Sequence, residues 1–167
     1  VFPEEYGGSG VSFLDLAVLL EETGRVPLPG PYFSTVVLGG LPILDAGSEA
    51  QKQQYLPRIA SGELLFALAL TEPNASYDAA AIEVKAADDK DGYILSGTKL
   101  FVADANVADF MLVTARTDDK AQPEDGITIF IVDAKSQGIS HRVLKTISND
   151  KPEKRKKEEK EGAHRIL

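Results

Sequence analysis

The sequence predicts an α+β protein in which helices come first and an antiparallel β-barrel or sandwich follows. Residues 1–62 carry helix-capping signals and apolar periodicity, whereas after Gly62 short apolar runs alternate with turn residues. Several short strands at this spacing favour an antiparallel sheet over alternating βαβ units. A doubly wound nucleotide-binding fold is therefore not expected.

The composition narrows the classes of protein. Of the 167 residues, 43% are hydrophobic and 26% are charged, which is typical of a globular domain, and no apolar run approaches the ~20 residues that cross a bilayer. The chain has no cysteine and no histidine cluster, so we expect no disulfide, cysteine nucleophile or metal site. The net charge of -8 disfavours nucleic-acid binding, because an acidic surface repels phosphates.

Capping signals locate two of three predicted helices. Ser12 is followed three residues later by Asp15, a pairing in which each side chain satisfies a backbone N–H of the other. Ser48 and Gln51 repeat the pattern. We expect helices over the apolar run 13–20 ending at Gly24, over 33–44 where Gly39, Gly40 and Pro42 weaken the signal, and from Ser48 to near Gly62, where Pro57 could bend or shorten the helix.

Six apolar or β-branched segments after Gly62 are predicted strands, with the hairpin turn Asp88–Gly92 as the clearest connection. The segment 151–167 begins with a nearly continuous charged run and is expected to be disordered or helical, because it cannot bury enough apolar surface. The predicted strands span 64–70, 81–86, 93–95, 110–115, 127–132 and 139–144, and the predicted units are 1–62, 63–150 and 151–167.

Several segments, in this order and spacing, give the chain a resemblance to the acyl-CoA dehydrogenase family. Each is weak alone, and together they cover nearly all of residues 1–150. The segments are Pro-Glu-Glu-Tyr-Gly-Gly-Ser-Gly from Pro3, Gly47 to Pro57 with 60–63, Leu-Thr-Glu-Pro from Leu70 with Asp78, Gly-Tyr-Ile-Leu-Ser-Gly-Thr-Lys from Gly92, 101–110, and Gly-Ile-Thr-Ile-Phe-Ile-Val-Asp from Gly126.

The resemblance implies a helical domain, a middle β-domain and a C-terminal helical domain, with FAD in the crevice between the last two. It also implies α,β-dehydrogenation of an acyl-CoA thioester, in which a carboxylate removes the α-proton and flavin accepts the hydride. The family places that carboxylate in the C-terminal domain. We therefore expect this chain to be a fragment, 1–62 and 63–150 supplying the end of the first domain and most of the second, with no catalytic base and no turnover alone.

The resemblance also implies which residues contact the ligands. The stretch 68–77 would line the flavin, with the Thr71 hydroxyl near the pyrimidine edge and Phe101 beside the ring. Two positions depart from the family pattern: Ala103 replaces a hydroxyl residue that bonds flavin N5, and Tyr77 replaces a serine that contacts flavin or acyl-CoA. The predicted cofactor contacts are Leu68, Leu70, Thr71, Phe101, Val102 and Ala103, and the predicted substrate contact is Tyr77.

Two alternatives follow from the same residues. The substitutions at Tyr77 and Ala103 could mark a non-catalytic binding or scaffold module that keeps the fold without flavin, and a related flavin oxidase or monooxygenase would look similar over 1–150. Family members form homo-oligomers largely through the C-terminal domain, so a monomer or a nonspecific associate is expected here. With no targeting segment visible, a bacterial cytoplasmic location is expected, with a mitochondrial one as the alternative.

Overall fold

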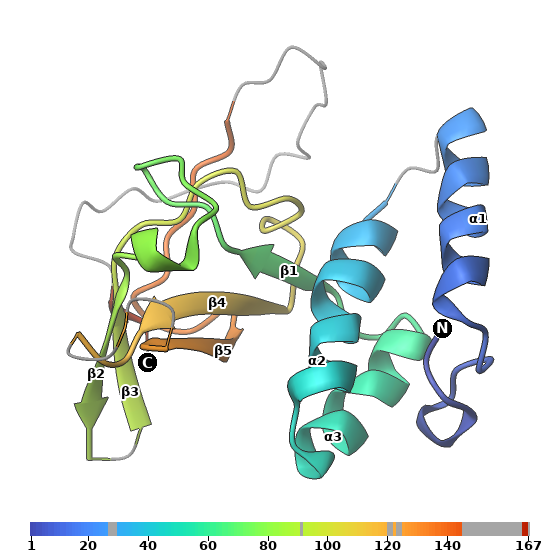
Figure 1. The fold of residues 1–167 in the computed structure, drawn as a ribbon, viewed down its shortest axis with the longest axis horizontal. Helices are drawn as coiled ribbons and strands as arrows, with labels where there is room; N and C mark the ends of the chain where they lie inside the picture. Colours follow the sequence, from blue (N-terminus) through green and yellow to red (C-terminus); the bar gives the residue numbers. More distant parts are fainter. Residues whose placement is uncertain (27–29, 91, 120–121, 123–124, 145–164, 167) are drawn as a thin grey trace.

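The computed structural model describes residues 1–26, 30–90, 92–119, 122, 125–144 and 165–166. Figure 1 shows the helices gathered at one end of the molecule and the sheet at the other, with β1 and β4 reaching toward the helices. The α+β class is thus confirmed. The elements are η1 (Glu4–Tyr6), α1 (Phe13–Arg25), η2 (Phe33–Gly40), α2 (Leu41–Ala46), α3 (Glu49–Ala60), β1 (Phe66–Ala69), η3 (Ala79–Ala81), β2 (Lys85–Asp89), β3 (Gly92–Ser96), β4 (Phe110–Arg116), β5 (Ile127–Asp133) and β6 (Arg165–Ile166).

Both predicted capping boxes form, one at the N-terminus of α1 and the other at the N-terminus of α3. The Asp15 carboxylate accepts a hydrogen bond from Ser12 N at 2.8 Å while the Ser12 hydroxyl accepts one from Asp15 N at 3.3 Å, and Ser48 and Gln51 do the same. Helix α1 runs through Gly24 to Arg25. Pro57 lies inside α3 without ending it.

The predicted helix over 33–44 is two elements, the π-helix η2 and the short helix α2. Gly39 is needed for packing, because a Cβ at this position would lie 2.4 Å from Phe66 Cβ. Thr35, in the middle of η2, accepts a hydrogen bond from Phe66 N at 3.1 Å and donates one to Phe66 O at 3.3 Å. The helical region therefore covers the free edge of β1 and satisfies its backbone.

The sheet is mixed, so the prediction of a purely antiparallel sheet was wrong. It is also open, so the predicted closed barrel was wrong. Strand β4 runs parallel to β1, with Phe66 opposite Phe110, and antiparallel to β5. It also meets β2 in parallel at Lys85 and Arg116, while β2 and β3 form the predicted antiparallel hairpin. The long connection from β1 to β4 permits a parallel pairing, which strand periodicity cannot distinguish from an antiparallel one.

Two of the predicted strands, 81–86 and 139–144, differ most from the structure. Asp78 caps the short helix η3 by accepting a hydrogen bond from Ala80 N, so the strand expected from Ala81 begins only at Lys85. The segment 139–144, which is described, forms no strand. In the predicted tail, Arg165–Ile166 pairs antiparallel with β3 through its backbone, and 151–164 and 167 lie outside the described residues.

Two apolar clusters meet at the β1 and β4 pair. One face packs against the helices and contains the edge-to-face aromatic pair Tyr55 and Phe66, with ring centroids 5.6 Å apart. The opposite face contributes Ala67, Ala69 and Met111 to the cluster within the sheet. Burial of both faces explains why these strands are continuously apolar.

Helix α1 is the exception to this packing. It buries Leu16 but leaves Phe13 and Leu14 exposed, and Figure 1 shows it at the outer side of the helical region. In the described part of the chain, no helix combines the length and hydrophobicity needed to cross a membrane.

Candidate functional site

A small cavity opens where β1 ends and the chain turns into the loop 70–82. Its volume is about 170 Å³, which is smaller than the ~300 to 1,000 Å³ typical of sites that enclose a ligand. Leu70, Glu72 and Thr114 contribute to it from the sheet end, and Ile127 and Ile129 from β5. The hollow can therefore receive only part of a larger ligand.

A buried ion pair lies at this cavity. The Lys99 ammonium donates to Glu72 Oε1 at 2.6 Å, to Thr114 Oγ1 at 2.8 Å and to the carbonyl of Leu70 at 3.2 Å. The side chain of Glu72 is 3% exposed and that of Lys99 is 9% exposed. We call Glu72, Lys99 and Thr114 the polar hub.

The polar hub is fully hydrogen-bonded. Glu72 Oε2 also accepts from Glu83 N at 2.7 Å, and Val84 N lies 3.2 Å from both carboxylate oxygens. Burial lowers the pKa of Lys99 below its ordinary value of 10.5, and the hydrogen bond to Glu72 offsets part of that shift. Because both charges are committed to partners, Glu72 is a structural anion and not a free base.

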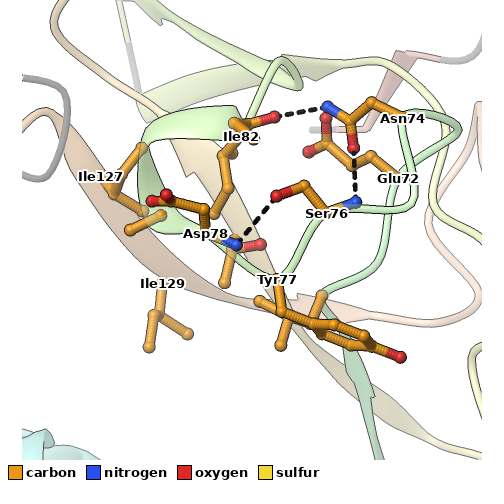
Figure 2. Close-up of a pocket in the computed structure, with 12 residues that line it drawn as sticks. Glu72, Asn74, Ser76, Tyr77, Asp78, Ile82, Ile127 and Ile129 are labelled. Carbon is orange, nitrogen blue, oxygen red and sulfur yellow. Dashed lines mark hydrogen bonds between the residues drawn. The ribbon is translucent and has the colours of Figure 1, made fainter.

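The loop after the polar hub is held by its own polar side chains. Asn74 Nδ2 donates to Ala81 O at 2.6 Å, Asn74 Oδ1 accepts from Ser76 N at 3.2 Å, and Ser76 Oγ accepts from Asp78 N at 3.1 Å (Figure 2). Arg116 Nε donates to Ile82 O at 3.0 Å and fixes the end of the loop. Tyr77 is 78% exposed, and its ring points away from Asp78 and Ile127 in Figure 2.

The second predicted segment, 101–103, is anchored at both ends. Leu100 N donates to Thr71 O at 2.7 Å, which joins it to the first predicted segment. At the other end Ser34 Oγ donates to Asp104 Oδ2 at 2.6 Å, tying the segment to η2. Phe101, between these anchors, has a φ of 53° and is 71% exposed.

The structure thus brings together some of the predicted site residues and separates others. Thr71 and the segment at Phe101 are neighbours through the Leu100 bond, and Leu70 and Tyr77 line the cavity. Leu68, however, packs into the helical cluster. Val102 packs against the sheet cluster, and the exposed Ala103 offers no hydroxyl.

Sequence reasoning did not assign functional roles to the polar hub. In the sequence, Glu72 and Lys99 belong to two separate family motifs. Because 27 residues separate them, no local pattern indicates that they form a pair. Thr114 gave the one available signal, a polar residue inside the otherwise apolar strand β4.

Comparison with known proteins decides the family. The model for the acyl-CoA dehydrogenase N-terminal domain matches residues 1–63, and that for the acyl-CoA dehydrogenase middle domain matches residues 67–153. The chain belongs to the acyl-CoA dehydrogenase family. The resemblance stated from the sequence motifs is therefore confirmed.

Individual family members agree with this assignment. The chain is 39% identical over 140 residues to acyl-CoA dehydrogenase FadE29 of Mycobacterium tuberculosis, covering 83% of this chain and 36% of that protein. Butyryl-CoA dehydrogenase of Megasphaera elsdenii superposes with a TM-score of 0.72 at 36% identity, over 82% of this chain and 37% of that one. The chain thus spans little more than a third of the length of these relatives.

A third relative bears on the cofactor. Glutaryl-CoA dehydrogenase of Mycobacterium smegmatis, solved in complex with FADH2, superposes with a TM-score of 0.57 at 34% identity, covering 65% of this chain and 27% of that one. In the present acyl-CoA dehydrogenase chain, the exposed Phe101 ring offers a face to a planar ligand. The Thr71 hydroxyl has no hydrogen-bond partner within the described residues, so it is free to bond one. These two groups fit a flavin, whereas Ala103 cannot supply a side-chain donor.

Proposed function

We propose that this chain forms the flavin-facing part of an FAD-dependent acyl-CoA dehydrogenase that oxidises the α,β carbon–carbon bond of an acyl-CoA thioester. The observation that carries the proposal is the Leu100 to Thr71 hydrogen bond of 2.7 Å, which places the Thr71 hydroxyl segment beside the exposed Phe101 segment. A polar edge next to an aromatic face suits a flavin ring. The family membership of the chain supports the same ligand.

Each predicted contact then has a physical task. FAD, when bound, supplies the hydride acceptor. Thr71 would donate a hydrogen bond to it, the Phe101 ring would shield it from water, and backbone N–H groups near Ala103 would remain as donors. Leu70 and Tyr77 line the adjacent cavity.

We do not assign the general base to the described residues that line the cavity. Glu72 is bonded to Lys99 and two backbone N–H groups, and Asp78 caps η3. A base must reach the α-proton with a free lone pair. We therefore propose that the base lies elsewhere in the assembled enzyme and that this chain alone has no turnover.

The absorption spectrum of the purified chain, taken after incubation with excess FAD and desalting, tests the flavin site. We expect a retained flavin band because the Thr71 and Phe101 segments are held in place without other parts of the enzyme. Flavin retained equally by a Phe101→Ala, Thr71→Val variant would contradict the proposed contacts. A colourless wild-type protein would contradict the proposed site itself.

A second candidate function is a binding or scaffold module without flavin. The observation that favours it is the pair of departures at Tyr77, which presents a bulky exposed ring, and Ala103, which lacks a hydroxyl. Ala103→Thr and Tyr77→Ser restore the family's residues. If the flavin proposal is right, Ala103→Thr should tighten FAD binding by about 1 kcal/mol, or roughly fivefold, because the side-chain hydrogen bond to flavin N5 is gained, whereas Tyr77→Ser, at the predicted substrate contact, should change FAD binding less. Binding that appears only in the double variant would favour the scaffold function.

Partner and location remain proposals. We propose an acyl-CoA thioester as the substrate class and a monomer or nonspecific associate for this chain, which light scattering after size-exclusion chromatography would test. A defined oligomer would contradict the latter. The bacterial cytoplasmic location, with the mitochondrial alternative, and the choice between dehydrogenase and oxidase or monooxygenase chemistry stay predictions from the sequence.

A further inference from the structure

We propose that Lys99 is a positioning residue that fixes the separation between the segments 70–71 and 101–103. The inference rests on the proposed function for the identity of the ligand, which is flavin. The contacts of Lys99 itself are independent of that function. They join the end of β1, the end of the β4 ladder and the loop that carries Phe101.

The first step of the argument is what happens where the strand ladder ends. Pairing between β1 and β4 stops at Ala69 and Val113. Beyond that point the Lys99 ammonium provides the cross-links, donating to Leu70 O at 3.2 Å and to Thr114 Oγ1 at 2.8 Å. The buried Lys99 ammonium therefore links the two chain segments beyond the point where β1 and β4 stop pairing through their backbones.

The second step concerns the loop on which Lys99 lies. The next residue, Leu100, donates its N–H to Thr71 O at 2.7 Å, and Phe101 follows with a φ of 53°. The far end is anchored separately by Ser34 and Asp104 at 2.6 Å. Loss of the Lys99 ammonium would thus release one end of the 101–103 segment and leave the other in place.

The third step is why lysine suits this position. An ammonium has three donors in a pyramidal arrangement, and here each of the three has an acceptor. A guanidinium is planar and its donors form a fixed fork, so it cannot reach the same three oxygens from one point. Arginine is consequently expected to keep the charge without restoring the positions of the two segments.

The experiment compares Lys99→Met and Lys99→Arg with a matched control, Lys85→Met. Lys85 also forms an ion pair, with Asp119, but its side chain is 58% exposed and lies outside the site. Two quantities are measured in each 167-residue variant: hydrogen exchange of the Leu100 amide by NMR, and the dissociation constant for FAD by flavin fluorescence.

We expect both Lys99 variants to speed exchange at Leu100 by at least about tenfold relative to the β4 amides of Leu112 and Val113. We also expect them to weaken FAD binding about ten- to a hundredfold, by analogy with the loss of affinity when the outer-shell partners of metal ligands are removed. Lys85→Met should change neither. A uniform loss of stability would speed exchange in β4 as much as at Leu100, and that result would overturn the proposal.

Unchanged exchange at Leu100 together with unchanged FAD affinity would also overturn it. If the wild-type chain binds no FAD, the proposed function fails while the exchange measurement still decides the role of Lys99.

If Lys99→Met does not fold, Glu72→Gln combined with Lys99→Met removes both buried charges and keeps an acceptor for Glu83 N. In the wild type, Leu100 exchange as fast as that of the exposed Gly97 would refute the positioning role.

Discussion

The polar contacts that join distant parts of this chain include two, Glu72 with Lys99 and Tyr6 with Glu49, that differ in what they hold. The Glu72 and Lys99 pair lies at the end of the sheet, where Lys99 has three acceptors and Glu72 has two further donors. The Tyr6 hydroxyl in the helical region makes one hydrogen bond, to Glu49 Oε1 at 2.7 Å. The first contact replaces a missing strand ladder, whereas the second adds to helices that an apolar cluster already holds. A buried ion pair thus connects loops that apolar packing alone leaves unconnected.

The largest effect is expected for Glu72→Leu. This change leaves the Lys99 ammonium buried without its anion and removes the acceptor of Glu83 N and Val84 N. Breaking one side of a buried ion pair costs about 3–5 kcal/mol, so the free energy of unfolding measured with urea should fall by that amount. The control Glu83→Leu, at an exposed side chain, should stay within about 0.5 kcal/mol. Equal losses in the free energy of unfolding for Glu72→Leu and Glu83→Leu would contradict the stabilising role of the buried ion pair.

A smaller effect is expected for Thr114→Val, which keeps the side-chain shape and removes the hydroxyl. The Lys99 ammonium loses one of its three acceptors, and hydrogen bonds to charged groups contribute about 1.5–3 kcal/mol. Thermal unfolding should therefore show a clear drop in midpoint. Thr128→Val on β5 serves as the control and should change little, because this exposed residue's hydroxyl lies 3.1 Å from the neutral Thr117 hydroxyl and not beside a buried charge. A midpoint that does not move would show that the polar hub does not need Thr114.

The smallest effect separates the two contacts by the sign of their pH dependence. The hydrogen bond to Glu49 raises the pKa of Tyr6 to about 12, so its stabilising contribution is complete below the ordinary value of 10.0 and is lost as pH rises from there toward 12. The wild type's advantage over Tyr6→Phe should shrink over that range in urea unfolding.

Lys99 should show the opposite trend. Because burial lowers its pKa, the unfolded chain binds more protons than the folded one below pH 10.5, and stability rises as pH approaches that value. The wild type's advantage over Lys99→Met should therefore grow with pH. If the wild type's stability advantage over both variants changed in the same direction with pH, the pKa of Tyr6 or of Lys99 would not be shifted in the direction that its surroundings imply.

The sequence by itself determined the local features of the fold. Ser12 and Ser48 begin their helices as their capping patterns predicted, and the Asp88–Gly92 segment joins two antiparallel strands. These features depend on hydrogen bonds between residues a few positions apart, which the order of residue types specifies. The family motifs likewise single out Thr71 and Phe101 from the sequence alone, although their ligand roles stay predictions.

Only the tertiary structure decided which distant segments meet. Strand β1 pairs in parallel with β4, Gly39 gives Phe66 room, and Leu16 is buried in α1 while Phe13 is not. None of these follows from periodicity, because strand direction and helix burial depend on the surfaces that the rest of the chain presents. The Glu72 and Lys99 pair is the clearest case, since 27 residues separate the two charges and only the end of the β1 ladder brings them together.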